Sequence, residues 1–129
     1  MAAGFENQLA VVFGGGRDIG GAIAVELARR GAQIALSYGS SDPAKVVAEI
    51  EATGQKAFAH KVDALDTAAI RSFVAAATKD AGKPIGVLVN VVGGLVARKK
   101  MDEMDDACWD RVFNSMCARF LQRRRRRFR

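Results

Sequence analysis

The sequence predicts an α/β fold in which helices cover both faces of a doubly wound parallel sheet. Apolar, β-prone runs alternate with segments of helical periodicity along most of the 129 residues. The first run, LAVVF at residues 9–13, leads through the glycine-dense turn GGGRDIGG into a helical segment. Unbroken apolar runs are typical of strands buried on both faces, and strands that alternate with helices form parallel sheets. Right-handed crossovers then favour the strand order 3-2-1-4.

Each element has its own signal in the chain. The expected strands are residues 9–13, 33–38, 56–62 and 86–92. The expected helices are residues 22–30, a segment that begins at Ser41-Asp42-Pro43 and stops at Gly54, a segment from Asp66 or Thr67 to about Gly82, and residues 106–121. Gly31 is well placed to cap the first helix, and a capping residue followed by proline is typical of a helix start.

The turn after the first strand has the composition of a phosphate-binding site. Glycine lets the backbone turn tightly and approach a ligand, and a helix N-terminus offers unpaired N–H groups and a positive dipole end. The common dinucleotide spacing G-x-G-x-x-G is not met in this turn. A ligand is expected at the carboxyl ends of the strands, where strands 1 and 4 part. The alternative is a glycine-rich turn that binds nothing.

The same turn resembles that of the short-chain dehydrogenase/reductase family, in which it runs Thr-Gly-x-x-x-Gly-Ile-Gly. Gly14, Ile19 and Gly20 match this pattern, while Phe13 replaces the threonine and Asp18 replaces the middle glycine. The resemblance implies a Rossmann-type domain that binds NAD(P). The turn residues it places at the cofactor are Gly14, Gly16, Arg17, Asp18, Ile19 and Gly20.

Two later segments are similar to the same family. Asp63 falls where the family carries an aspartate after strand 3, and the resemblance implies that it accepts a hydrogen bond from the adenine amino group. Asn90 and Gly93 match the first and last residues of the family's Asn-Asn-Ala-Gly segment, which lines the adenosine pocket and steadies the sheet. The alternatives are that Asp63 is a turn residue and that Asn90 is purely structural.

The choice of cofactor depends on the end of strand 2. A carboxylate there would bind the ribose hydroxyls of NAD, but residues 37–41 contain no acid. Tyr38, in this segment, is expected to contact the cofactor, and Arg17 is expected to reach a 2′-phosphate, as the matching basic residue does in relatives that prefer NADP. NADP is therefore the expected cofactor, with NAD possible. Asp18 is expected to cap the following helix and point away from the diphosphate.

The catalytic part of the family pattern is missing. The family transfers a hydride between nicotinamide and a carbonyl or alcohol, using a tyrosine and a lysine four residues later. The single tyrosine here, Tyr38, is followed at that distance by Asp42, and Met116 stands where the family has a catalytic asparagine, with Asn114 two residues early. The resemblance, which covers residues 9–113, therefore implies the cofactor-binding half of a reductase-like enzyme, inactive alone, with no catalytic residue.

The net charge of +6 belongs to the end of the chain. Residues 122–129 carry six arginines, and without them basic and acidic residues balance. We expect a domain at residues 1–121 and a disordered arginine-rich tail at 122–129. So abrupt a change of composition is typical of a truncated or frame-shifted copy, although a genuine short relative is the alternative. The rival functions are a non-catalytic module that binds polyanions through the tail and an inactive partner subunit of a full-length relative.

Composition also argues against several partners and compartments. No aromatic platform for nucleic acid is apparent, so nucleic-acid binding is unlikely, and no apolar run approaches the ~20 residues of a membrane span. Cys108 and Cys117 lie too far apart along one expected helix to form a disulfide, which favours free thiols in the cytoplasm. No residue cluster has metal-ligand spacing, and His60 is expected to be packed or on the surface.

The last expected strand and helix should leave apolar surface uncovered. The strand at 86–92 would lie at the edge of the sheet, because no fifth strand follows it in the chain. An apolar edge strand favours pairing with another chain. We therefore expect dimerisation or aggregation through this strand and the helix at 106–121.

Overall fold

The computed structural model describes residues 4–93 and 100–116 of the chain. The chain divides into two compact units, Met1–Val91 and Val92–Arg129, and each is described by itself. The first unit contains the sheet and the helices that cover it. The arginine-rich tail, Cys117 and residues 117–121 of the last expected helix lie outside the described residues.

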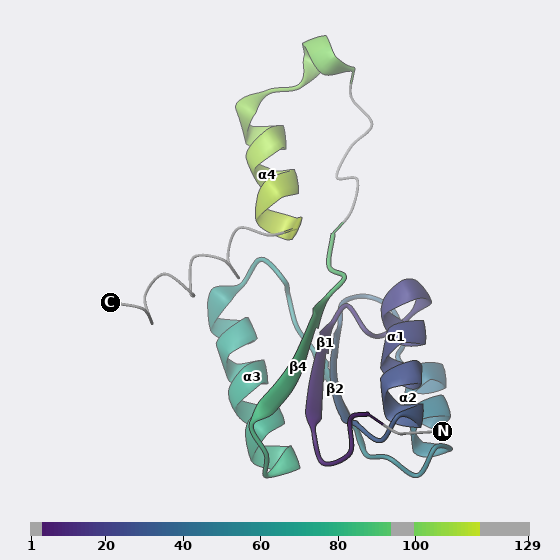
Figure 1. The fold of residues 1–129 in the computed structure, drawn as a ribbon. Helices are drawn as coiled ribbons and strands as arrows, with labels where there is room; N and C mark the ends of the chain where they lie inside the picture. Colours follow the sequence, from purple (N-terminus) through teal and green to yellow (C-terminus); the bar gives the residue numbers. More distant parts are fainter. Residues whose placement is uncertain (1–3, 94–99, 117–129) are drawn as a thin grey trace. The chain divides into compact units, whose positions relative to one another are not determined.

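The first unit alternates strands and helices as predicted. Its elements are β1 (Leu9–Phe13), α1 (Asp18–Arg29), β2 (Gln33–Tyr38), α2 (Ala44–Glu51), β3 (Ala57–Lys61), α3 (Thr67–Ala81) and β4 (Ile85–Asn90). In the described part of the chain the strands form one parallel sheet in the order β3-β2-β1-β4, so the predicted topology is confirmed. Helices α1 and α2 lie on one face of this sheet and α3 lies on the other (Figure 1).

The core is built around β1, which is buried along its whole length. On the α1 and α2 face, Val12 and Leu36 of the sheet belong to one apolar cluster with Val25 and Ile50 of the helices. On the α3 face, the rings of Phe13 and Phe73 meet edge to face with centroids 5.2 Å apart. Full burial of one phenylalanine side chain contributes about 1.5–3 kcal/mol to the stability of the fold. Packing on both faces thus fixes the end of β1, where the glycine turn begins.

Helix α1 begins earlier than the sequence predicts, at Asp18 rather than at residue 22. Residues 14–21 are rich in glycine, which favours a turn by local propensity. In the structure Gly20 and Gly21 instead belong to the first turn of α1, where Gly20 lies close to the Gly14 carbonyl. The end of α1 is as predicted: Gly31 has φ +98° and its N–H donates to the Ala28 carbonyl at 2.9 Å. The next N–H, that of Ala32, donates to the Leu27 carbonyl at 3.1 Å, which completes a Schellman motif.

The other helices of this unit begin and end close to the predicted positions. Pro43 is the residue before α2 rather than its first helical residue, and Asp42 Oδ1 accepts the Ala44 N–H at 3.0 Å. Asp66 caps α3 by accepting the N–H groups of Ala68 and Ala69, and Gly82 ends that helix in the left-handed conformation. These are the capping roles that the sequence indicates.

The strand limits differ from the prediction mainly in β4. Strand β2 has the predicted bounds, and β3 lies within the predicted range. Strand β4 runs from Ile85 to Asn90 instead of residues 86–92. The N–H of Val91 still donates to the Phe13 carbonyl at 3.1 Å, so the backbone follows β1 for one residue beyond the strand.

The second unit contains a short 3₁₀ helix, η1 (Met101–Glu103), and helix α4 (Asp106–Met116). Asp105 Oδ1 accepts the Cys108 N–H at 2.7 Å at the start of α4. The rings of Trp109 and Phe113 lie 4.6 Å apart on this helix, and each residue is about half exposed. Among the described residues, no helix is long and apolar enough to cross a membrane.

Candidate functional site

The glycine turn is fixed to the end of β2 by one buried side chain. Gly14 has φ +78°, a backbone conformation that glycine adopts readily and that turns the chain sharply after β1. Its N–H donates to the hydroxyl of Ser37 at 3.1 Å, and the Gly15 N–H donates to the Ser37 carbonyl at 2.9 Å. Ser37 is 3% exposed and is the only polar residue in the described part of the chain that is classed as buried. It therefore holds the turn in place.

The start of α1 lies directly against this turn. A Cβ added to Gly20 would overlap the carbonyl oxygen of Gly14 and lie 2.6 Å from Cγ2 of Val91. A Cβ added to Gly16 would lie 2.8 Å from Cβ of Tyr38, at the end of β2. The turn therefore presents backbone rather than side chains, at the point where the carboxyl ends of β1, β2 and β4 come together.

The first turn of α1 offers backbone donors. The Gly21 N–H donates to the Arg17 carbonyl at 2.9 Å, but no described residue accepts the N–H groups of Ile19 or Gly20. Such unpaired donors and the positive end of the helix dipole favour an anion. The arrangement can therefore bind a phosphate group through the backbone.

Arg17 and Asp18 are both exposed at this helix start. Arg17 is the residue before the helix, with extended backbone, and its side chain is 71% exposed. Asp18 is the first helical residue and has φ +49°. Its Oδ2 lies 3.4 Å from Nε of Arg17, and its side chain is 80% exposed.

The expectation that Asp18 caps α1 is wrong. A capping side chain belongs to the residue before the helix and accepts an N–H from the first turn. Asp18 stands inside that turn, and no side-chain capping hydrogen bond forms there. Because the helix starts earlier than predicted, the residue in the capping position is Arg17, which has no acceptor to offer.

The predicted residues at the ends of β2 and β3 are neighbours through the backbone. The Tyr38 carbonyl accepts the Val62 N–H at 3.0 Å, and Asp63 follows directly. Asp63 is exposed, and its Oδ1 accepts the Leu65 N–H at 2.8 Å. It therefore has the turn role that was the alternative to adenine binding, while it also lies at the same edge of the sheet as the glycine turn.

The remaining predicted residues fall in two different units. Asn90 ends β4 in register with Phe13, next to the glycine turn. Gly93 belongs to the second unit and is exposed. Ile19 is 71% exposed on α1.

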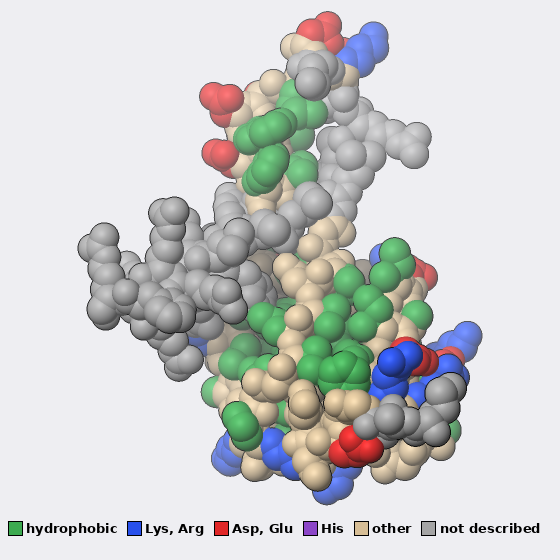
Figure 2. Space-filling model, viewed as in Figure 1, with side chains coloured by type: hydrophobic (Ala, Val, Ile, Leu, Met, Phe, Trp, Pro, Cys, Tyr) green, Lys and Arg blue, Asp and Glu red, His purple; other side chains and the backbone are tan. Residues whose placement is uncertain are grey.

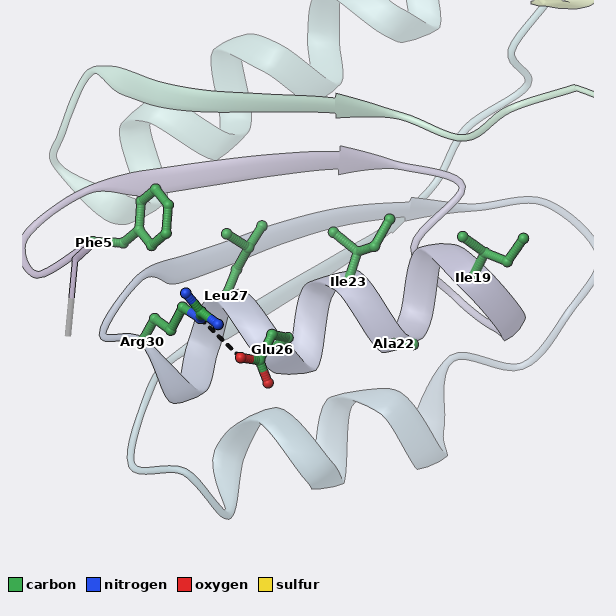
Figure 3. Close-up of a pocket in the computed structure, with 7 residues that line it drawn as sticks. All are labelled: Phe5, Ile19, Ala22, Ile23, Glu26, Leu27 and Arg30. Carbon is green, nitrogen blue, oxygen red and sulfur yellow. Dashed lines mark hydrogen bonds and ion pairs between the residues drawn. The ribbon is translucent and has the colours of Figure 1, made fainter. Parts of the chain in front are cut away.

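An open, largely apolar groove of about 520 Å³ lies along α1 and reaches Ile19 at the start of the helix. Its lining residues are Phe5, Ile19, Ala22, Ile23, Glu26, Leu27 and Arg30 (Figure 3). The side chains of Ile19, Ile23 and Leu27 point to one side of the helix, while Glu26 accepts a hydrogen bond from Arg30 at 2.8 Å. Figure 2 shows apolar side chains gathered on this part of the surface.

Ser37 holds the glycine turn in place, a role that the sequence analysis does not assign to it. A serine within the apolar run QIALSY is nevertheless a signal, because a buried hydroxyl needs a hydrogen-bond partner.

His60 packs against Phe73, with ring centroids 5.4 Å apart, and its Nε2 lies 3.7 Å from Oδ2 of Asp80. Among the described residues, no group of three or more histidine, cysteine or acidic side chains could hold a metal ion.

A parallel sheet of this order, with a glycine turn feeding a helix at the end of β1, defines a nucleotide-binding domain of the Rossmann type. Residues 8–121 match the family model described as short chain dehydrogenase. The chain therefore belongs to the short-chain dehydrogenase/reductase family.

Curated relatives include oxidoreductases from bacteria and fungi. The chain is 35% identical over 114 residues to the 2,3-dihydro-2,3-dihydroxybenzoate dehydrogenase of Bacillus subtilis, covering 88% of this chain and 43% of that protein. It is 39% identical over 110 residues to a hydroxynaphthalene reductase-like protein, Arp2, of Metarhizium guizhouense, covering 84% and 40%. The chain thus spans less than half the length of these relatives.

Solved structures agree in fold. A dehydrogenase/reductase from Sinorhizobium meliloti superposes with a TM-score of 0.81 at 33% identity, covering 88% of this chain and 45% of that one. The NADH-dependent reductase A1-R′, solved in complex with NAD, superposes with a TM-score of 0.78 at 30% identity, covering 89% and 48%.

Proposed function

We propose that this chain is the cofactor-binding part of an NAD(P)-dependent oxidoreductase that interconverts carbonyl and alcohol groups. The observation that carries the proposal is the close contact of Gly20 with the Gly14 carbonyl, which leaves a backbone-lined turn at the start of α1. The unpaired N–H groups of Ile19 and Gly20 suit an anionic diphosphate. The residues present therefore fit a dinucleotide.

The residues that we assign to the cofactor act by binding and orienting it. The backbone of the glycine turn would hold the diphosphate, with Asp63 at the adenine and Tyr38 beside the adenosine. The full set is Gly14, Gly16, Arg17, Asp18, Ile19, Gly20, Tyr38, Asp63, Asn90 and Gly93. When bound, the nicotinamide supplies or accepts the hydride.

We propose a preference for NADP over NAD. Arg17 is an exposed cation at the start of α1, beside the turn in which Gly16 contacts Tyr38. Residues 37–41, at and after the end of β2, contain no carboxylate to bind ribose hydroxyls or repel a 2′-phosphate. Both features favour the phosphorylated cofactor.

The chain by itself should bind cofactor without turnover. Tyr38 lies at the end of β2, where its carbonyl accepts the Val62 N–H, and the residue four positions later is Asp42. No lysine is therefore spaced to act with this tyrosine or to hold the ribose. We propose no catalytic residue in this chain, with residues 1–121 as the binding domain and 122–129 as a tail.

We also propose that the chain associates with a second copy of itself in the cytoplasm. Within the described residues β4 pairs only with β1, and Leu88 on this edge strand is 51% exposed. Two identical edges can pair antiparallel about a two-fold axis, which makes the contact self-complementary. The half-exposed Trp109 and Phe113 of α4 add apolar surface. Cys108 is a free thiol, as a reducing cytoplasm favours.

Titration of the full chain with NADPH and NADH, followed by nicotinamide fluorescence, tests the proposal. Saturable binding of both is expected, with NADPH the tighter ligand and no consumption of either in the presence of carbonyl compounds. Absence of binding to either cofactor would contradict the proposed function. Equal affinities would contradict only the preference for NADP.

A further inference from the structure

Asp18 places a carboxylate and an unusual backbone conformation at the start of the candidate phosphate site. Its φ of +49° lies in the left-handed region that favours glycine, and the family pattern has glycine at this position. Asp and Asn are the side chains that tolerate this conformation best. The chain therefore carries a charged residue at a position whose backbone conformation favours glycine.

This carboxylate stands where two sources of positive potential meet. As the first residue of α1, Asp18 lies at the positive end of the helix dipole, which stabilises an acidic side chain in the first turn. Its Oδ2 also lies 3.4 Å from Nε of Arg17. The same backbone donors and the same guanidinium are the groups that would attract a phosphate.

We propose that Asp18 is a specificity-determining residue that acts as an internal competitor for phosphate. Its carboxylate forms an ion pair with Arg17 and partly neutralises the positive potential at the start of α1. A ligand with a phosphate near Arg17 must displace it and then bind beside its negative charge. The inference rests on the proposed function, because it concerns the affinity of the same site. Its consequence is that the chain binds NADPH more weakly than its backbone and Arg17 allow.

Asp18→Asn is the variant that isolates the charge. Asparagine has nearly the same size and tolerates a positive φ, so the turn keeps its conformation. Because exposed ion pairs are weak, we expect the Kd for NADPH to fall about two- to fivefold. The Kd for NADH should fall less, since it lacks the 2′-phosphate. Glu51→Gln, on the exposed end of α2, removes the same charge elsewhere and should leave both values unchanged.

Arg17→Gln completes the test. In this background the extra gain that Asp18→Asn gives NADPH over NADH should shrink, because the guanidinium for which the carboxylate competes is gone. The two cofactors are titrated at fixed ionic strength by nicotinamide fluorescence, and circular dichroism checks that each variant folds. A fall in the Kd for NADPH that exceeds the fall for NADH in the natural background, and that shrinks in the Arg17→Gln background, would support the inference.

Other outcomes would overturn the inference. If the natural chain binds NADPH and Asp18→Asn binds it equally or more weakly, Asp18 does not compete, while the proposed function stands. If Glu51→Gln tightens NADPH binding as much as Asp18→Asn does, the effect is one of net charge. If neither the natural chain nor Asp18→Asn binds a cofactor, both the inference and the proposed function are wrong.

Discussion

Replacement of Gly20 by alanine tests the contact between α1 and the glycine turn. The added Cβ would overlap the carbonyl oxygen of Gly14 and lie 2.6 Å from Cγ2 of Val91. The carbonyl is backbone and cannot rotate away, so the start of α1 must move. Overpacking costs about 1–3 kcal/mol, and a backbone clash belongs at the upper end.

Part of this cost is offset by the helix itself. Alanine is about 1 kcal/mol more favourable than glycine inside a helix. The net loss for Gly20→Ala is therefore about 2 kcal/mol of unfolding free energy. For a domain of 60–100 residues this corresponds to a fall in Tm of about 8–16 °C. Because the backbone donors of α1 move with the helix, binding of NADPH should also weaken.

Gly21→Ala is the matched control, because it gains the same helix propensity one residue further on. Its Cβ would lie 2.8 Å from Cγ2 of Val46, a side-chain methyl group that can shift, and 3.5 Å from the Gly15 carbonyl oxygen. The small steric cost of the added Cβ and the gain in helix propensity nearly cancel at this position, so the unfolding free energy should change little. Thermal melts by circular dichroism and NADPH titration check both variants. A Gly20→Ala variant that melts with the natural chain and binds NADPH equally would refute this account of the turn.

Three further predictions concern other contacts. Ser37→Ala removes the hydroxyl that accepts the Gly14 N–H and should cost about 1–3 kcal/mol in urea unfolding, whereas the exposed Ser40→Ala should cost nothing measurable. Leu88→Lys should reduce the mass measured by light scattering at micromolar concentration, because a charge on the exposed edge strand opposes pairing; a natural chain that is already monomeric would contradict this. Asp66→Ala should lower stability by about 1 kcal/mol in a thermal melt, and Asp66→Asn should restore most of it.

The fold was predictable because its strongest signals are local. The runs at β1 and β2 are apolar and bounded by glycine and polar turns, so their limits follow from the sequence. Asp66 and Gly82 likewise mark the ends of α3 by their own chemistry. The strand order follows from the handedness of the crossovers, which is a property of every such unit.

The start of α1 was not predictable in the same way. Its first turn contains Gly20 and Gly21, which disfavour a helix by propensity, and the absence of a side chain at Gly20 is what lets this turn lie against the Gly14 carbonyl. The role of Ser37 also depends on a tertiary contact, since its partner Gly14 lies 23 residues away. Such contacts decide the geometry of the site but leave only a weak trace in the sequence.

Position 18 shows how the same backbone can carry different binding properties. Glycine there would adopt the positive φ without strain and leave the helix dipole and Arg17 free for a ligand. Aspartate accepts some strain, but its charge stabilises the first turn by about 0.3–1 kcal/mol when no ligand is bound. An anion that takes the place of the carboxylate at the helix start loses this stabilisation, so we expect its net binding to be weaker. We therefore expect a turn that matches a family in its glycines to differ from it in anion affinity through the charge of Asp18.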